Sequence, residues 1–184
     1  SFASAQTVAR ALVTSMEKGI FIFDIDENDA WTENRKVIPT SNDPEEGPKR
    51  PVRAVYRDGI IYVADSMSAT DVTATSFVRK YNLKGEYLGD FCTFDGPIDG
   101  LVFSPDGRYL FASKYIGNVG GLYRYDVEKQ EWTGYHTNYM GTQQLAVDNA
   151  GHLFVASRYT NTWEGNLDVY EYETMTEIKN WRGK

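Results

Sequence analysis

Two positive side chains recur in register along the chain, at positions where they could bind a polar ligand. Lys114 and Arg158 end the phrases LFASK and FVASR, which lie 44 residues apart, and a tyrosine follows each of them. Both side chains can donate charge-assisted hydrogen bonds to a carboxylate or to several hydroxyl groups. Tyr115, Tyr159 and Trp163 would add flat apolar contact. This pattern predicts a ligand-binding surface.

Two carboxylates belong to the same candidate site. Asp65 ends the phrase YVAD, and Asp99 opens the phrase DGLVF. Beside Lys114 and Arg158, these carboxylates would either help to bind a polar ligand or simply neutralise the positive charges as ion pairs. The sequence leaves both alternatives open.

Asp65, His136 and Glu164 are the candidate catalytic residues. Histidine exchanges protons near neutral pH, which suits His136 to work as a general base, and either carboxylate could act as an acid or base. The plainer interpretation of His136 is an edge-strand histidine near the surface. His152 falls in a glycine turn, where a structural role is expected, and the single cysteine, Cys92, carries no signature of a catalytic thiol.

The composition excludes several classes of function. The 184 residues are 41% hydrophobic, which is enough for the core of a single domain over residues 1–184. A net charge of −7 argues against nucleic acid as a partner, because phosphate binding requires clustered Lys and Arg. No membrane-spanning run is present, and residues 1–15 lack the pattern of a secretion signal. A lone cysteine fits a cytoplasmic location, and secretion after removal of a signal stays open.

The elements that would position these side chains come from an internal repeat. Copies of one pattern follow each other at a spacing of 44 to 48 residues. The two clearest copies align without a gap, with Gly107 on Gly151 and Ser113 on Ser157. The copies lie at residues 11–26 (degenerate, with its first strand expected at 2–6), 51–66, 97–115 and 141–159.

Each copy has the same order of strands. An apolar strand ends in a glycine turn, a strand of small and apolar residues follows, and then come an alternating third strand and a more polar fourth one. Period-two alternation with closely spaced turns favours antiparallel sheet. Four strands per repeat is typical of a β-propeller, an all-β fold, and the alternative is a β-sandwich with similar strands. The expected four-stranded blades are residues 1–43, 51–96, 97–140 and 141–184, with 44–50 as a polar connection.

One end of such blades would carry the site. It gathers the blade linkers, the starts of the first strands and the loops after the second strands. In this sequence that end is polar and aromatic, whereas the opposite end holds plain turns such as SPDG and DNAG. The expected ligand-binding residues at this end are Arg53, Asp65, Asp99, Lys114, Tyr115, Gln143, Arg158, Tyr159 and Trp163.

The phrases PIDGLVFSPDGRYLFAS and GIIYVADS resemble the propeller group that includes NHL repeats, gluconolactonase-like hydrolases, strictosidine synthase and bacterial lactonases. The resemblance implies a propeller that serves either binding or catalysis. In gluconolactonase-like members a divalent metal is held on the axis, and the matching carboxylates here are Asp65 and Asp99. Oxygen ligands suit Ca²⁺ or Mg²⁺. Because Lys114 and Arg158 bring positive charge to that rim, no metal or other cofactor is expected.

Four blades are few for this group. The chain could close alone, belong to a longer propeller, or pair with a second copy to make eight blades, and we favour the homodimer because it covers both exposed end flanks.

The predicted function is a binding or scaffold propeller that recognises a small polar ligand or a protein, with no nucleic acid or membrane partner. The alternative is an enzyme of the lactonase, gluconolactonase or strictosidine-synthase type.

Overall fold

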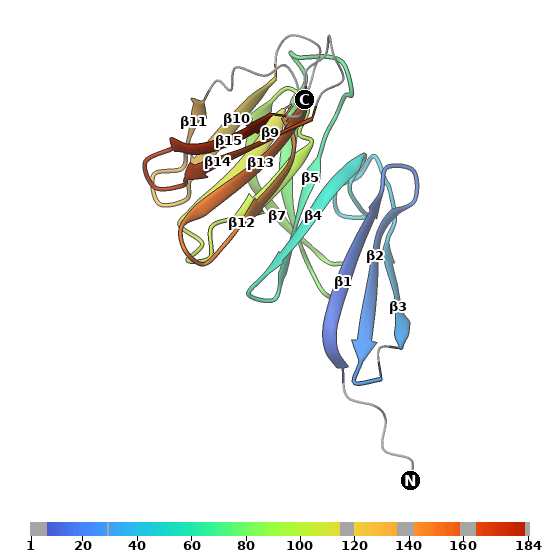
Figure 1. The fold of residues 1–184 in the computed structure, drawn as a ribbon. Coiled ribbons are helices and arrows are strands. Elements are labelled where there is room, and N and C mark those ends of the chain that lie inside the picture. The colour runs from blue at the N-terminus through green and yellow to red at the C-terminus, as the bar shows by residue number, and fades with distance from the viewer. Residues whose placement is uncertain (1–6, 29, 115–119, 136–141, 159–164, 183–184) are drawn as a thin grey trace. The chain divides into compact units, whose positions relative to one another are not determined.

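The computed structural model describes residues 7–28, 30–114, 120–135, 142–158 and 165–182, and the regular structure in these ranges is antiparallel β-sheet (Figure 1). The described residues contain no helix long and apolar enough to cross a membrane. The all-β prediction is therefore confirmed.

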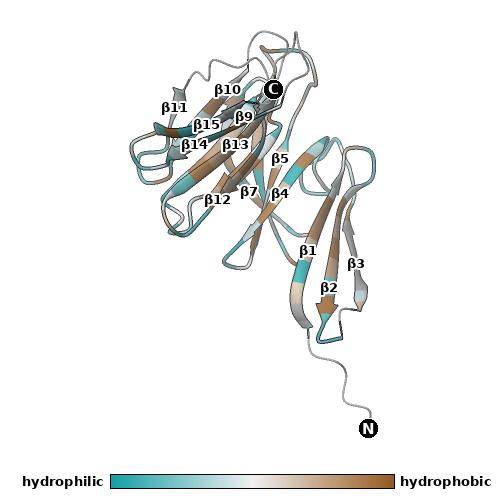
Figure 2. Cartoon of the chain, in the orientation of Figure 1, coloured by the Kyte–Doolittle hydropathy of each residue, from teal (hydrophilic) through white to brown (hydrophobic). Residues whose placement is uncertain are grey.

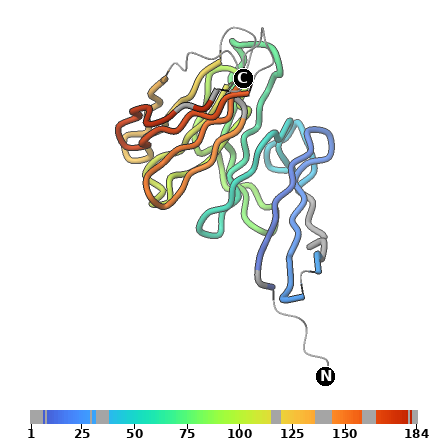
Figure 3. Tube along the Cα trace, in the orientation of Figure 1, coloured from blue at the N-terminus to red at the C-terminus, as the bar shows by residue number. Residues whose placement is uncertain are grey.

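Strands that follow one another in the chain pair with one another, so each sheet is a simple meander. In Figure 3 the colour consequently changes by small steps from strand to strand within a sheet. The first sheet contains β1 (Thr7–Ser15), β2 (Gly19–Asp26) and β3 (Trp31–Ile38), and the second contains β4 (Pro51–Arg57), β5 (Ile60–Asp65), β6 (Thr75–Asn82) and β7 (Tyr87–Asp95). The third contains β8 (Gly100–Phe103), β9 (Tyr109–Lys114), β10 (Gly121–Asp126) and β11 (Glu131–Tyr135), and the fourth contains β12 (Thr142–Val147), β13 (His152–Arg158), β14 (Gly165–Glu171) and β15 (Thr176–Arg182).

The degenerate first copy forms the three-stranded sheet. Its β1 and β2 are the strands that the sequence predicts as the second and third of the blade, and β3 is the fourth. The expected first strand, at residues 2–6, lies outside the described residues.

The chain divides into two compact units, of which the first comprises Ser1–Asp65 and Val78–Phe91. Its core lies where β1 packs against β4, and the alternating apolar residues of the strands face inward. Figure 2 shows the apolar, brown part of β2 and the hydrophilic, teal turn that follows the strand. The fully buried members of this core are Ile20, Ile22, Ile38, Ile61, Val63 and Tyr81.

The connection at residues 44–50 is fixed tightly to the first unit. Gly47 and Pro48 are buried, and the Tyr81 hydroxyl donates a hydrogen bond of 3.1 Å to the carbonyl of Pro44. Burial of the Tyr81 ring raises the pKa of its hydroxyl well above the ordinary value for tyrosine. The connection therefore acts as part of the core rather than as a loose linker.

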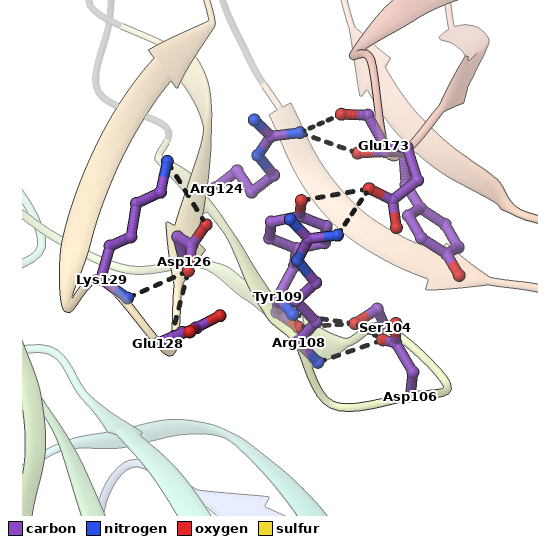
Figure 4. A network of polar contacts seen from close by, with 10 residues as sticks. Ser104, Asp106, Arg108, Tyr109, Arg124, Asp126, Glu128, Lys129 and Glu173 are labelled. Atoms are coloured by element: carbon purple, nitrogen blue, oxygen red, sulfur yellow. Dashed lines mark hydrogen bonds and ion pairs between the residues drawn. The ribbon is translucent and has the colours of Figure 1, made fainter.

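The second unit comprises Ser66–Phe77 and Cys92–Lys184, and its core joins the third and fourth sheets. Tyr109, Phe111 and Leu122 meet Leu153 and Val155 there. Beside this core the Arg124 guanidinium lies over the Tyr109 ring at 4.5 Å and donates hydrogen bonds to the carbonyls of residues 172 and 173 (Figure 4). Apolar burial and a cation–π contact thus bind the two sheets together.

The glycine turns have the conformation that the repeat predicts. Gly59, Gly107 and Gly151 adopt φ values of 83°, 78° and 97° between the first and second strands of their sheets. This left-handed region favours glycine because a Cβ atom is strained there. His152 follows the last of these turns, and its Nδ1 lies 2.8 Å from Oδ2 of Asp148.

We expect Gly151→Val to destabilise the protein by about 1–3 kcal/mol through backbone strain alone. A Cβ atom at Gly151 would meet no atom within 4 Å, so no clash at the Cβ position adds to the strain. Gly165→Val is the matched control, because Gly165 also has open space around it and is not among the glycines with positive φ. Urea denaturation measures both variants, and equal midpoints for the two would show that φ at Gly151 does not limit stability.

Candidate functional site

The structure describes some of the expected site residues and not others. Arg53, Asp65, Asp99 and Lys114 are fully described, whereas Gln143 and Arg158 are described as backbone positions in β12 and β13. The remaining site and catalytic candidates lie outside the described residues, and they are Tyr115, His136, Tyr159, Trp163 and Glu164.

Asp65, the last residue of β5, is fully buried and held by three contacts. Its Oδ2 lies 2.8 Å from Nε of Arg79 and accepts a hydrogen bond of 2.9 Å from the amide of Lys49. Its Oδ1 accepts a hydrogen bond of 2.6 Å from the amide of Arg50. The carboxylate therefore fixes the connection between the first two sheets to the end of β5 through the two amide hydrogen bonds, and it also forms an ion pair with Arg79 of β6.

The cation in this pair is a residue that the sequence analysis did not identify. Arg79 lies on β6, two residues before the buried Tyr81, and is only 8% exposed. The sequence does contain a signal for the burial of Arg79, because residues i and i+2 share one face of a strand. Arg79 therefore lies on the same face as the buried Tyr81. The sequence left ion pairing and ligand binding open for Asp65, with Lys114 or Arg158 as the partners of an ion pair.

Arg53 and Asp99 occupy the beginnings of their repeats, as expected. Arg53 lies on β4 opposite Ala64 and is half-buried. Asp99 is half-buried just before β8, and its backbone amide donates a hydrogen bond of 2.9 Å to the carbonyl of Ser113. Within the described parts of the chain, no three His, Cys, Asp or Glu side chains are grouped so as to hold a metal ion.

Lys114, the last residue of β9, has a buried ammonium group. The residue is 6% exposed, and Nζ donates a hydrogen bond of 2.9 Å to the carbonyl of Asp95. The side chain lies directly over Gly96, where a Cβ atom would come within 2.5 Å of Nζ. An ammonium group has three donors, and the described residues supply an acceptor for one of them. Among the described residues, Lys114 is thus a buried side chain whose ammonium group contacts one acceptor, not the surface charge that the sequence predicts.

Ser157 and Asn166 form a second buried polar position. They are directly opposite each other on β13 and β14, so both side chains lie on one face of the fourth sheet. Ser157 is 7% and Asn166 6% exposed, yet the Ser157 hydroxyl and both polar atoms of the Asn166 amide have no hydrogen-bond partner among the described residues. The same face continues through Val155 and Leu153 into the core of the second unit.

Asp168 extends this polar position. It lies on β14, two residues from Asn166 and opposite Val155, and it is completely buried. The sequence analysis placed Ser157 at the end of a second strand but did not identify Asn166 or Asp168. The sequence feature that indicates burial of Asn166 and Asp168 is their spacing from Tyr170, because residues two apart share one face of a strand. Tyr170 is buried in the core.

Comparison with known proteins shows the fold and nothing more specific. No family model and no curated protein matches the chain. Among solved structures, the chain is similar to one in a nidogen–laminin complex, with a TM-score of 0.67 and 14% identity over 94% of this chain and 60% of that one. It is also similar to the Dos1 propeller, with a TM-score of 0.62 and 10% identity over 96% of this chain and 46% of that one. It is also similar to a gluconolactonase from Xanthomonas campestris (TM-score 0.61, 16% identity, 95% and 58%).

These similarities show that the chain has a β-propeller fold, as the repeat predicts. Proteins that share so little sequence can share a fold without sharing a function. The chain spans about half the length of the solved structures that it resembles.

Proposed function

We propose that this chain is a binding propeller that recognises a small polar ligand at the ends of β9, β13 and β14. The observation that carries the proposal is the pair Ser157 and Asn166, whose polar atoms are buried without a partner among the described residues. Leaving a buried polar group unpaired costs about 1–3 kcal/mol. A bound ligand that supplies the missing hydrogen bonds would remove that cost.

The side chains indicate the chemistry of the ligand. An amide and a hydroxyl each donate and accept hydrogen bonds, which suits a ligand with several hydroxyl groups. Lys114 lies at the end of β9 that corresponds to the Ser157 end of β13, and it adds a positive charge for which the described residues supply one hydrogen-bond acceptor. The combination favours a hydroxylated carboxylate.

The alternative is an enzyme of the lactonase, gluconolactonase or strictosidine-synthase type. The resemblance would assign Asp65 to the axial metal of a gluconolactonase or to a catalytic carboxylate. Asp65 is instead bonded to Arg79 and to two backbone amides, so a metal ion would have to displace all three contacts. This arrangement supports the binding module over the metal-dependent hydrolase.

Thermal unfolding with gluconate tests the proposal, because gluconate joins a carboxylate to a chain of hydroxyl groups. A ligand at one hundred times its Kd stabilises a protein by about 2.7 kcal/mol. For a chain of this size that corresponds to a rise in Tm of about 5–10 °C. Sorbitol, which lacks the carboxylate, is expected to give a clearly smaller rise at the same concentration.

Two variants locate the effect. The variants Asn166→Leu and Lys114→Met should fold and lose the gluconate-dependent rise in Tm. Asn166→Leu should also raise the Tm of the unliganded protein, because an unpaired polar group is removed from the interior. Lys129→Met, in the exposed turn before β11, is the matched control and should keep the rise. An unchanged rise in both site variants would contradict the proposal, and Ca²⁺-dependent hydrolysis of gluconolactone would favour the enzyme.

We further propose that two copies of the chain associate as a homodimer. The chain spans 60% of its counterpart in the nidogen–laminin complex and 58% of the gluconolactonase, and a second copy would contribute further blades. Twofold pairing is the commonest way in which proteins form closed assemblies.

A further inference from the structure

The first sheet has one buried and one exposed apolar face. Leu12 and Ile22 pair on the face that packs into the core of the first unit. On the other face Val13 pairs with Phe21, and Val13 is 46% exposed. Trp31, which pairs with Ile25 on that same face, is 60% exposed, and its ring lies 6.0 Å from the ring of Phe23.

The fourth sheet shows the same asymmetry. Leu153 and Val155 face the core of the second unit. On the opposite face Leu167 pairs with Trp181, and they are 37% and 47% exposed. Ala156, which pairs with Leu167 across β13 and β14, lies on this face too and is only half-buried.

The second and third sheets differ from these two in the strands β5 and β9. In β9 of the third sheet, Leu110 and Phe111 point to opposite faces and both are fully buried. In β5 of the second sheet, Val63 and Ala64 are likewise both fully buried. The strands β5 and β9 therefore have no exposed apolar face, and the exposed apolar side chains of the second sheet, Tyr56 and Leu88, lie on β4 and β7. Exposed apolar patches such as those of the first and fourth sheets mark interaction sites.

We propose that the exposed face of the first sheet in one copy packs on the exposed face of the fourth sheet in a second copy. This inference rests on the proposed homodimer and names its contact surfaces. Each copy carries one face of each kind, so a twofold pair with two such contacts would cover all four faces. Trp31 and Trp181 are the expected anchors, because buried tryptophans dominate the energy of protein interfaces.

Light scattering tests the pairing itself. We expect the unmodified chain to have about twice its mass of 20.9 kDa at micromolar concentration. A monomer that stays monomeric on concentration would overturn the homodimer, and with it this inference.

Charge substitutions test which faces are in contact. Trp31→Glu and Trp181→Glu should each weaken pairing by roughly a hundredfold, because a carboxylate would be buried at the centre of a contact. Leu88→Glu is the matched control, because Leu88 is 45% exposed but lies on β7 of the second sheet. This variant should remain dimeric. Val13→Lys and Leu167→Lys provide a second pair of variants on the same two faces if a tryptophan variant fails to fold.

Mixing the two tryptophan variants identifies the geometry. In a mixed pair, the altered faces meet each other in one contact and the other contact is intact, so the mixture should recover dimers that neither variant forms alone. If Trp181→Glu forms dimers normally while Trp31→Glu does not, the first sheets of the two copies contact each other. Persistent dimers in both variants would show that the contact lies elsewhere, although the homodimer itself would stand.

Discussion

Replacing Asp65 with asparagine is expected to lower the free energy of unfolding by about 3–5 kcal/mol. The change leaves the Arg79 guanidinium, which is only 8% exposed, without its counter-charge in the interior of the first unit. It also weakens the two hydrogen bonds from the amides of Lys49 and Arg50, because a neutral amide oxygen is a poorer acceptor than a carboxylate. Urea denaturation of the variant and the parent protein measures the difference.

A double-mutant cycle separates the ion pair from the other contacts of Asp65. Arg79→Met removes the cation and keeps the length of the side chain, and the double variant Asp65→Asn with Arg79→Met leaves no buried charge at this position. We expect the double variant to be more stable than the sum of the two single effects predicts, because the penalty of an unpaired buried charge disappears. Strict additivity would show that Asp65 and Arg79 do not stabilise each other.

Gly19→Ala is expected to destabilise the protein by about 3–5 kcal/mol, since backbone strain and crowding act together. Gly19 has a φ of 110°, and a Cβ atom there would lie 1.9 Å from the carbonyl oxygen of Ile38 and 2.9 Å from Cα of Pro39. Both are backbone atoms, one at the end of β3, which pairs with β2, and one in the residue after it, so relief requires the backbone at the end of the sheet to shift. Thermal or urea unfolding measures the loss.

Two other glycines resolve this effect into its parts. At Gly59 the φ is 83° but no atom lies within 4 Å of an added Cβ, so Gly59→Ala reports strain alone and should cost about 1 kcal/mol. At Gly47 no positive φ is found, but a Cβ would lie 1.8 Å from the carbonyl oxygen of Pro39, so Gly47→Ala reports crowding alone. If Gly19→Ala proves no worse than Gly59→Ala, the carbonyl of Ile38 moves aside at little cost.

The fold follows from patterns that are local in the chain. The alternation in GIFIFDID predicts a strand, and β2 spans Gly19–Asp26. The glycines aligned by the repeat, Gly107 and Gly151, predict turns with positive φ, and both turns have it. Such features depend on a few neighbouring residues and on the steric limits of each peptide unit, so they can be recognised before any long-range contact is known.

The surroundings of the charged and polar side chains were decided by the tertiary structure. The sequence by itself determined that Asp65 and Lys114 end equivalent strands, but not that Arg79 would neutralise the first or that Gly96 would lie beneath the second. It placed Ser157 at a strand end without showing that Asn166 stands opposite. Burial and pairing of a polar group depend on the strand register and on the sheet that packs against it, and neither can be read from the residue's own neighbours in the chain.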